Sequence, residues 1–347
     1  MRFVSPLLKH ALYPALHYSG WLDRIMPSCG YTVVTYHGVT PTGYSGGDPF
    51  LDGSLVDQRV LRQQLQFLKT HYHVLHPEEF RAWIEHGMQL PARSVLLTCD
   101  DGLANTLTDM LPVLESESVS CLLFVTNASC GDHPGMLWYD ELYLLMRLRP
   151  LTAPDLQLPP EEGENSSSAE SFPAQWWNTV RRASRLQADA RAQWMDQVRI
   201  HCDPPQDFRS ARRWQLLNIS ELKQLAGRGM SIGAHTRSHP VLSLCSDEEA
   251  RREVQESKAA LEQILGRPIW AFAYPFGDPS TMGEREVRLV REASFACAFL
   301  NVQHWKEAER SHPFALSRIH VTSQMTLPEF AAHVSSVHVR LRRAVRR

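Results

Sequence analysis

The sequence lacks any uninterrupted apolar run of the ~20 residues that a bilayer-spanning helix requires. Its first 30 residues place basic residues and prolines between short apolar stretches, without the apolar core or small-residue cleavage site of a secretory signal. No excess of one charge is present either, because 36 lysines and arginines face 38 aspartates and glutamates. We therefore expect a cytoplasmic protein without a nucleic-acid partner.

Cysteine pairs of the CxxC type are also missing. The cysteines are scattered, odd in number and often embedded in apolar runs: Cys29, Cys99, Cys121, Cys130, Cys202, Cys245 and Cys297. This distribution argues against a zinc ribbon or a disulfide framework and favours buried free thiols in a reducing compartment. Hydrophobic residues at 43% and charged residues at 21% indicate a soluble globular chain with a substantial core.

The two chain ends carry the features that bear on membrane contact. Residues 1–30 are predicted to form a helical segment, either an ordinary packing helix or a weak amphipathic helix on a membrane surface. Residues 326–347 are predicted to form a C-terminal helix ending in the basic run Val339–Arg347. Such an end fits plain solvation or contact with an anionic lipid or polyanionic carrier, so peripheral membrane association stays open.

Seven short, mostly apolar runs are predicted to be strands buried on both faces. They are Tyr31–Tyr36, Ser94–Thr98, Ser120–Thr126, Met230–Ala234, Pro268–Ala273, Ser294–Phe299 and Phe314–Val321. Helical patterns lie between them, at Val60–Lys69 and at Ser246–Leu261, where a serine and a glutamate three residues later form a capping-box pattern. This alternation predicts an α/β domain over residues 31–325, with a parallel sheet or a (β/α) barrel.

One region interrupts the alternation. Residues 150–172 are rich in Pro, Glu and Ser, a composition that buries little apolar surface and predicts a mobile loop. A helical stretch with Trp and Arg residues follows from residue 174 to about 200. We therefore interpret residues 140–214 as a largely helical and loop insertion into one domain.

Two adjacent carboxylates, Asp100 and Asp101, and then Gly102 follow the second predicted strand. In parallel α/β folds the C-terminal ends of the strands form the ligand-binding edge, so these acids are candidates for chemistry. The alternative is a turn in which Asp101 and Gly102 simply close the strand.

Two histidines, His235 and His239, follow the fourth predicted strand. At this spacing they can present ring nitrogens to one metal, although solvated or capping histidines explain the pattern equally well in isolation. Together with one carboxylate they make a three-ligand site with open positions for water and substrate, which a hydrolytic metal needs. The second carboxylate of the pair would then remain free to take a proton from water.

Two further strand ends carry candidate residues. Tyr274, Pro275 and Phe276 form a proline-fixed turn, which could offer a backbone amide to an oxyanion and aromatic rings to a sugar; core packing is the alternative. His37 stands where the first strand meets Gly38, as a satisfied core histidine or as a general acid.

These four segments together resemble the polysaccharide deacetylase family, also called the NodB-homology or carbohydrate esterase family 4 fold. The T-F-D-D-G motif of that family is matched by Thr98–Gly102, with Cys99 in place of Phe, and its H-[ST]-x-x-H motif by His235–His239. Its R-x-P-[YFW] motif is matched at Pro275 and Phe276, with Ala273 at the Arg position. The resemblance spans about residues 31–321 without the insertion, and the His37 segment resembles circularly permuted members that deacetylate poly-N-acetylglucosamine.

The resemblance implies a distorted (β/α)7 barrel and a role for each matched residue. Asp100 would be the general base, and Zn²⁺ or a similar divalent metal would be bound by Asp101, His235 and His239. The Phe276 amide would stabilise the oxyanion. His37 would be the general acid, with His320 as the second candidate, and Arg318 is a candidate substitute for the missing motif arginine.

The implied activity is hydrolysis of the N-acetyl amide of an amino sugar in a polysaccharide or glycoconjugate, with release of acetate. The implied partner is an N-acetylated oligosaccharide, polysaccharide or glycolipid. Two alternatives stay open: a deacylase that acts on another acyl group or a lipid-linked sugar, and a catalytically inactive carbohydrate-binding relative.

Overall fold

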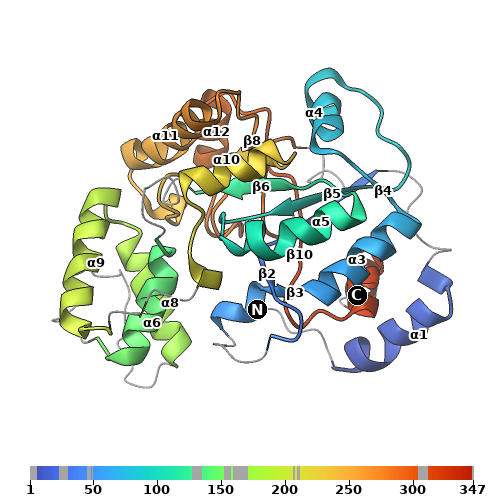
Figure 1. Ribbon diagram of the computed structural model, residues 1–347, viewed down its shortest axis with the longest axis horizontal. Helices are drawn as coiled ribbons and strands as arrows, with labels where there is room; N and C mark the ends of the chain where they lie inside the picture. The colour runs from blue at the N-terminus through green and yellow to red at the C-terminus, as the bar shows by residue number, and fades with distance from the viewer. Residues whose placement is uncertain are drawn as a thin grey trace.

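Parallel strands form the centre of the molecule (Figure 1). The computed structural model describes residues 6–22, 30–44, 48, 50–126, 135–151, 158, 171–205, 208, 212–303 and 312–345. Its main sheet has the order β10-β1-β5-β6-β7-β8-β9, and the short β4 (His73–Val74) also pairs with β5. The strands of this path are β1 (Tyr31–Tyr36), β5 (Ser94–Cys99), β6 (Leu122–Val125), β7 (Ser231–Ala234), β8 (Ala271–Ala273), β9 (Cys297–Phe299) and β10 (Ile319–His320).

The strands separate two apolar layers, because successive side chains of a strand point to opposite faces. In β5, Val95 and Leu97 belong to the core between the sheet and the outer helices, whereas Leu96 belongs to the cluster inside the curled sheet. β6 follows the same rule, with Leu123 outside and Phe124 inside. Burial on both faces explains why these strands are continuous apolar runs in the sequence.

The curled sheet is brought towards closure by the segment before β10. β10 pairs in parallel with β1, and Leu316, three residues before β10, forms a parallel bridge with Phe299 of β9. The predicted α/β class and distorted (β/α)7 barrel are therefore confirmed. The last predicted strand is shorter than expected, because residues 314–318 connect the two edges of the sheet and only Ile319–His320 pair as a strand.

Helices cover the outside of the sheet (Figure 1). Those that surround it are α3 (Gln58–His71), α4 (Pro77–His86), α5 (Leu111–Glu117), α10 (Ile219–Gly227), α11 (Asp247–Leu265), α12 (Glu284–Glu292) and α13 (Leu327–Val334). The predicted serine cap of α11 is present, since Ser246 accepts a hydrogen bond from the amide of Glu249. The Glu249 carboxylate does not return to the cap as a capping box requires, because it accepts a hydrogen bond from the amide of Ala188.

A helical lobe stands beside the barrel, at the left of Figure 1, and consists of α6 (Trp138–Leu148), α8 (Phe172–Ala183) and α9 (Ala188–Cys202). Its helices bury a separate apolar cluster that includes Leu142, Trp176 and Met195. The lobe overlaps the region predicted as an insertion but begins two residues before it, at Trp138, and the domain boundaries remain a proposal. Of the Pro-, Glu- and Ser-rich stretch, residues 152–157 and 159–170 lie outside the described residues.

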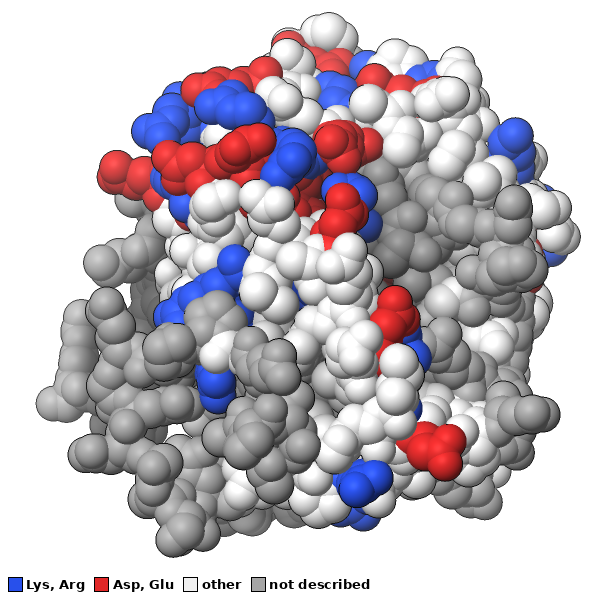
Figure 2. All heavy atoms as spheres, turned by 90° about the vertical axis from the view of Figure 1, so that its left-hand side faces the viewer, with Lys and Arg blue, Asp and Glu red and all other residues white. Residues whose placement is uncertain are grey.

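The remaining helices are near the chain ends, where α1 (Tyr13–Tyr18) contacts α13, and α14 (Val337–Val345) follows α13. Among the described residues, no helix combines the length and apolarity needed to cross a membrane. On the face of the lobe side, Figure 2 shows acidic and basic side chains alternating over its upper part. This part of the surface therefore has no large patch of one sign.

Candidate metal centre and active site

The candidate residues follow the C-terminal ends of three strands of the main sheet, β1, β5 and β7. Asp100 and Asp101 come directly after β5, His235 comes directly after β7, and His37 comes directly after β1. The carboxyl ends of parallel strands meet at one edge of a sheet, so residues separated by more than a hundred positions are brought together there.

Asp101, His235 and His239 converge on one point. The Nε2 atoms of His235 and His239 lie 3.4 and 3.3 Å from Asp101 Oδ1, and 3.1 Å from each other. All three side chains are buried, and they form a group of ligand atoms of the kind that holds a metal ion. The two predicted histidines and one of the two predicted acids are thus brought together.

This donor set fits a small divalent transition metal. With metal–ligand bonds of about 2.0–2.1 Å, the ligand atoms of a tetrahedral zinc site lie roughly 3.3–3.4 Å apart. The three separations of 3.1–3.4 Å match those edges to within a few tenths of an ångström. Two imidazoles and one carboxylate are also ligands that zinc and its neighbours in the first transition row accept.

The local surroundings orient this group. The Nδ1 atom of His235 hydrogen-bonds to the carbonyl of Ala273 at 2.8 Å, which directs its Nε2 atom towards Asp101. Burial alone would raise the pKa of Asp101, but hydrogen bonds with His235 and His239 hold the pKa well below its usual range. Asp101 is therefore ionised at neutral pH, as a metal ligand must be.

Asp100 is held separately by an arginine from the other end of the chain. Arg318 Nη1 and Nη2 donate to the two carboxylate oxygens of Asp100 at 2.7 and 2.5 Å, and both residues are 1% exposed. Burial alone would raise the pKa of Asp100, but the charge and hydrogen bonds of Arg318 outweigh it and lower the pKa. Arg318 Nε donates to the carbonyl of Leu300 at 2.7 Å, which fixes the guanidinium.

Two histidines stand beside Asp100. His37 Nε2 lies 3.9 Å from Asp100 Oδ2, and the ring of His37 is 4.5 Å from that of His320 between centroids. Burial lowers the pKa of His320 to about 3, and the neighbouring His37 contributes to the shift. His320 is therefore neutral near pH 7 and unsuited to donating a proton as an imidazolium, while the side chain of His37 is 16% exposed.

The three residues of the proline turn, Tyr274, Pro275 and Phe276, differ in their burial and in their contacts. Phe276 has φ +60°, and no described residue accepts a hydrogen bond from its amide. Its ring packs against His239 at 5.0 Å between centroids. Tyr274, by contrast, is buried in the outer core, and its hydroxyl donates to the carbonyl of Phe314. The burial of Tyr274 gives no support to its predicted role as a substrate contact, which stays a prediction, and Pro275 is a buried part of the turn.

The sequence-based reasoning missed three aromatic residues of the helical lobe. The ring of Tyr139 lies 5.0 Å from that of His239 and 5.3 Å from that of Phe276, and the ring of Trp177 lies 5.2 Å from that of Phe276. Trp138 Nε1 donates to the carbonyl of His239 at 3.1 Å. The Trp-Tyr pair at positions 138 and 139 was the available signal, but its sequence distance from the histidines concealed it.

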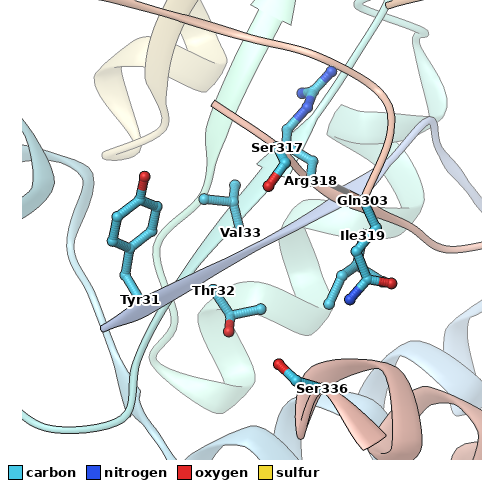
Figure 3. A pocket seen from close by; sticks show the side chains of 8 residues that line it. All are labelled: Tyr31, Thr32, Val33, Gln303, Ser317, Arg318, Ile319 and Ser336. Atoms are coloured by element: carbon cyan, nitrogen blue, oxygen red, sulfur yellow. The ribbon is translucent and has the colours of Figure 1, made fainter. Parts of the chain in front are cut away.

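A hollow elsewhere in the molecule is distinct from this centre. Figure 3 shows its lining residues, Tyr31, Thr32, Val33, Gln303, Ser317, Arg318, Ile319 and Ser336. None of the three grouped ligands lines it, and Tyr31–Val33 are the first residues of β1, whereas the centre lies beyond the last. This hollow therefore lies at the start of β1, away from the three grouped ligands, but Arg318, which holds Asp100, also lines it.

A comparison with protein families gives one match. The family described as "Polysaccharide deacetylase" matches residues 206–293, a segment that contains His235, His239, Pro275 and Phe276 but not Asp100 or Asp101. No curated protein matches this chain in sequence.

Several solved structures share the fold. The Streptococcus pyogenes deacetylase PplD in complex with acetate aligns with a TM-score of 0.56 and 16% identity, over 89% of this chain and 99% of that chain. IcaB from Ammonifex degensii aligns with a TM-score of 0.55 and 17% identity, over 89% and 98%. A de-N-acetylase from Aggregatibacter actinomycetemcomitans aligns with a TM-score of 0.52 and 14% identity, over 86% and 97%. These structural alignments show a common fold along most of the chain.

Proposed function

We propose that this chain is a metal-dependent hydrolase that removes the acetyl group from an N-acetylated amino sugar of a polysaccharide or glycoconjugate. The observation that carries the proposal is the convergence of Asp101, His235 and His239 on one point, with Asp100 beside them but engaged by Arg318. The family match and the similar folds of a solved deacetylase and a solved de-N-acetylase support the choice of reaction.

In this proposal Asp101, His235 and His239 hold the metal, which supplies a Lewis acid for the acyl oxygen and lowers the pKa of water. Zn²⁺ or another divalent transition metal fits the donor set. Asp100 acts as the general base. Arg318 donates one hydrogen bond to each of its carboxylate oxygens and keeps it ionised at neutral pH.

The remaining steps fall to His37 and Phe276. The tetrahedral oxyanion accepts a hydrogen bond from the amide of Phe276, a donor that no described residue engages. His37 protonates the leaving amine as the C–N bond breaks. His37 is chosen over His320 because His320 has a pKa of about 3, too low to hold a proton for donation near neutrality.

An aromatic wall supports a sugar as the substrate. Tyr139, Trp177 and Phe276 form a chain of ring contacts that begins at His239, and all three are partly exposed. Aromatic faces of this kind suit the apolar C–H faces of a pyranose ring or an acetyl methyl group. The wall joins residues of the barrel and the helical lobe, so the lobe would contribute to substrate choice.

The alternative of an inactive carbohydrate-binding relative is disfavoured by Arg318. A binding protein has no need to hold a buried carboxylate beside a metal site, and burying an ion pair costs several kcal/mol of desolvation. Here Asp100 and Arg318 are both almost fully buried and paired through two hydrogen bonds.

The test measures metal content and acetate release from N-acetylglucosamine oligomers with the wild-type protein and three variants. We expect Asp101→Asn to lose metal and activity, and Asp100→Asn to keep metal but lose most activity. The control is Asp247→Asn, because Asp247 has a side chain that is 83% exposed and pairs with Arg285, and it is not one of the grouped ligands. Near-normal turnover by Asp100→Asn, or wild-type protein that binds no divalent metal, would refute the proposal.

A further inference from the structure

A buried polar cluster outside the catalytic residues links the helical lobe to residues His235–His239, which we call the histidine loop. Arg191 of α9 is 2% exposed, and its Nη2 atom donates to the hydroxyl of Ser238. Glu253 of α11 is fully buried; it accepts hydrogen bonds from the Ser238 amide, at 2.8 Å, and from the Ser238 hydroxyl. The Nη2 atom of Arg191 lies 3.8 Å from Oε1 of Glu253. We call this group the Ser238 clamp.

The clamp acts on a loop that needs to be held. Thr236 and His239 are both non-glycine residues with left-handed backbone angles, φ +65° and +55°. Such conformations are unfavourable and persist only where surrounding contacts determine them. Ser238 lies directly before His239, so hydrogen bonds at its amide and hydroxyl restrain the backbone from which the His239 imidazole projects.

A second contact from the lobe reaches His239 itself. The indole Nε1 of Trp138, the first residue of α6, donates to the carbonyl of His239 at 3.1 Å. The guanidinium of Arg191 lies over the Trp138 ring, 5.1 Å from its centroid. Arg191 therefore contacts both Ser238, which directly precedes His239, and Trp138, which donates to the His239 carbonyl.

We propose that Arg191 and Trp138 are positioning residues for the metal centre, so that the helical lobe sets the affinity and geometry of metal binding through Ser238 and His239. The proposal rests on the proposed metal-dependent function. It gives the buried Arg191–Glu253 pair a role beyond stability, because a buried ion pair alone is weak support for stability.

Arg199 offers a matched control on the same helix. Its guanidinium makes two hydrogen bonds to Glu141 of α6, at 2.7 and 2.9 Å, within the lobe. Glu141 is buried, so Arg199→Met removes an arginine–glutamate pair that joins α9 to α6. Among the described residues, the Arg199 side chain donates to Glu141 and Asp196, and neither belongs to the histidine loop. It therefore perturbs the lobe without releasing Ser238 or His239.

The experiment measures the dissociation constant for Zn²⁺ by chelator competition and the visible absorption spectrum of the Co²⁺-substituted full-length protein. Loss of partners outside the ligand set typically weakens metal binding about 10- to 100-fold, which is the effect expected for Arg191→Met, with an altered Co²⁺ spectrum. Arg199→Met should lower the thermal midpoint but leave the Zn²⁺ dissociation constant and the Co²⁺ spectrum unchanged.

Trp138→Phe keeps one aromatic ring but removes the indole N–H together with the pyrrole ring that carries it, so it tests the proposal even if Arg191→Met fails to fold. We expect it to weaken Zn²⁺ binding roughly 2- to 10-fold. Wild-type Zn²⁺ affinity in Arg191→Met or in Trp138→Phe, or equal weakening by Arg199→Met, would overturn the inference. If instead the wild-type protein binds no Zn²⁺ or Co²⁺, the proposed function itself fails.

Discussion

Replacing Arg318 by methionine tests how the general base is held. The variant removes a buried guanidinium and leaves the Asp100 carboxylate buried without its two donors, at 2.7 and 2.5 Å. Breaking one side of a buried ion pair costs about 3–5 kcal/mol of unfolding free energy. Burial would then be opposed only by His235 and His37, and the pKa of Asp100 should rise, so the pH below which activity falls should move upward.

A double-mutant cycle in urea unfolding measures the coupling between Arg318 and Asp100. Arg318→Met, Asp100→Asn and the double variant should be strongly non-additive, with the double variant more stable than the sum of the single losses predicts by about 2 kcal/mol or more. The control is Arg228→Met, since Arg228 pairs with Glu115 on the surface, with side chains 38% and 41% exposed. Its loss should be below about 1 kcal/mol.

The activity of Arg318→Met provides the second readout. General base catalysis contributes about 10²–10⁴-fold, so a misoriented or protonated Asp100 should lower kcat towards that range while metal binding is retained. Two results would refute the reasoning: losses in the cycle that add within about 0.5 kcal/mol, and an Arg318→Met enzyme with the wild-type acid limb in its pH profile.

Three further predictions concern the histidines. The pKa of His320 is lowered to about 3, so between about pH 6.5 and 3 the unfolded chain binds a proton that the folded protein does not. Stability is thus lost as the pH falls, and His320→Gln should remove about 3 kcal/mol of the loss between pH 7 and 4 in urea unfolding. His37→Gln should lower kcat by about 10²-fold or more with an unchanged metal dissociation constant; weakened metal binding would contradict its role as the acid. His235→Ala should lose the metal, and excess Zn²⁺ should not restore acetate release to the wild-type level.

The fold was predictable where local pattern and burial agree. The apolar run Tyr31–Tyr36 coincides with β1, the run Ser94–Thr98 ends one residue before β5 does, and the next four runs contain β6 to β9. The segment 314–321 was predicted as a full strand, yet only Ile319–His320 form a strand and Leu316 makes a single bridge, because the segment carries Arg318 into the interior as it connects β9 to β1. That outcome depends on closure of the sheet, which periodicity does not report.

The candidate site was predictable in its ligands but not in its surroundings. Period-two alternation along β8 places Ala273 inside and Phe272 and Tyr274 outside, and it was the signal that would have assigned Tyr274 to the core. The same alternation turns the small side chain of Ala273 towards the interior. The Arg318 guanidinium packs near Phe124 of this interior cluster and donates to Asp100 from there.

Contacts from the helical lobe were beyond sequence reasoning altogether. Tyr139 and Trp138 lie about a hundred residues before His239, and neither belongs to a motif. Their approach depends on how α6 packs against the barrel. Tertiary packing of this kind leaves no periodic trace in the sequence.

Anomalous X-ray scattering from crystals grown with Zn²⁺, collected above and below the zinc absorption edge, tests the central claim most directly. The account predicts one strong anomalous peak within about 2.0–2.2 Å of Asp101 Oδ1 and of the Nε2 atoms of His235 and His239, with Asp100 outside the bonding distance. Zinc bound elsewhere, or a centre in which Asp100 replaces one of these three ligands, would contradict it.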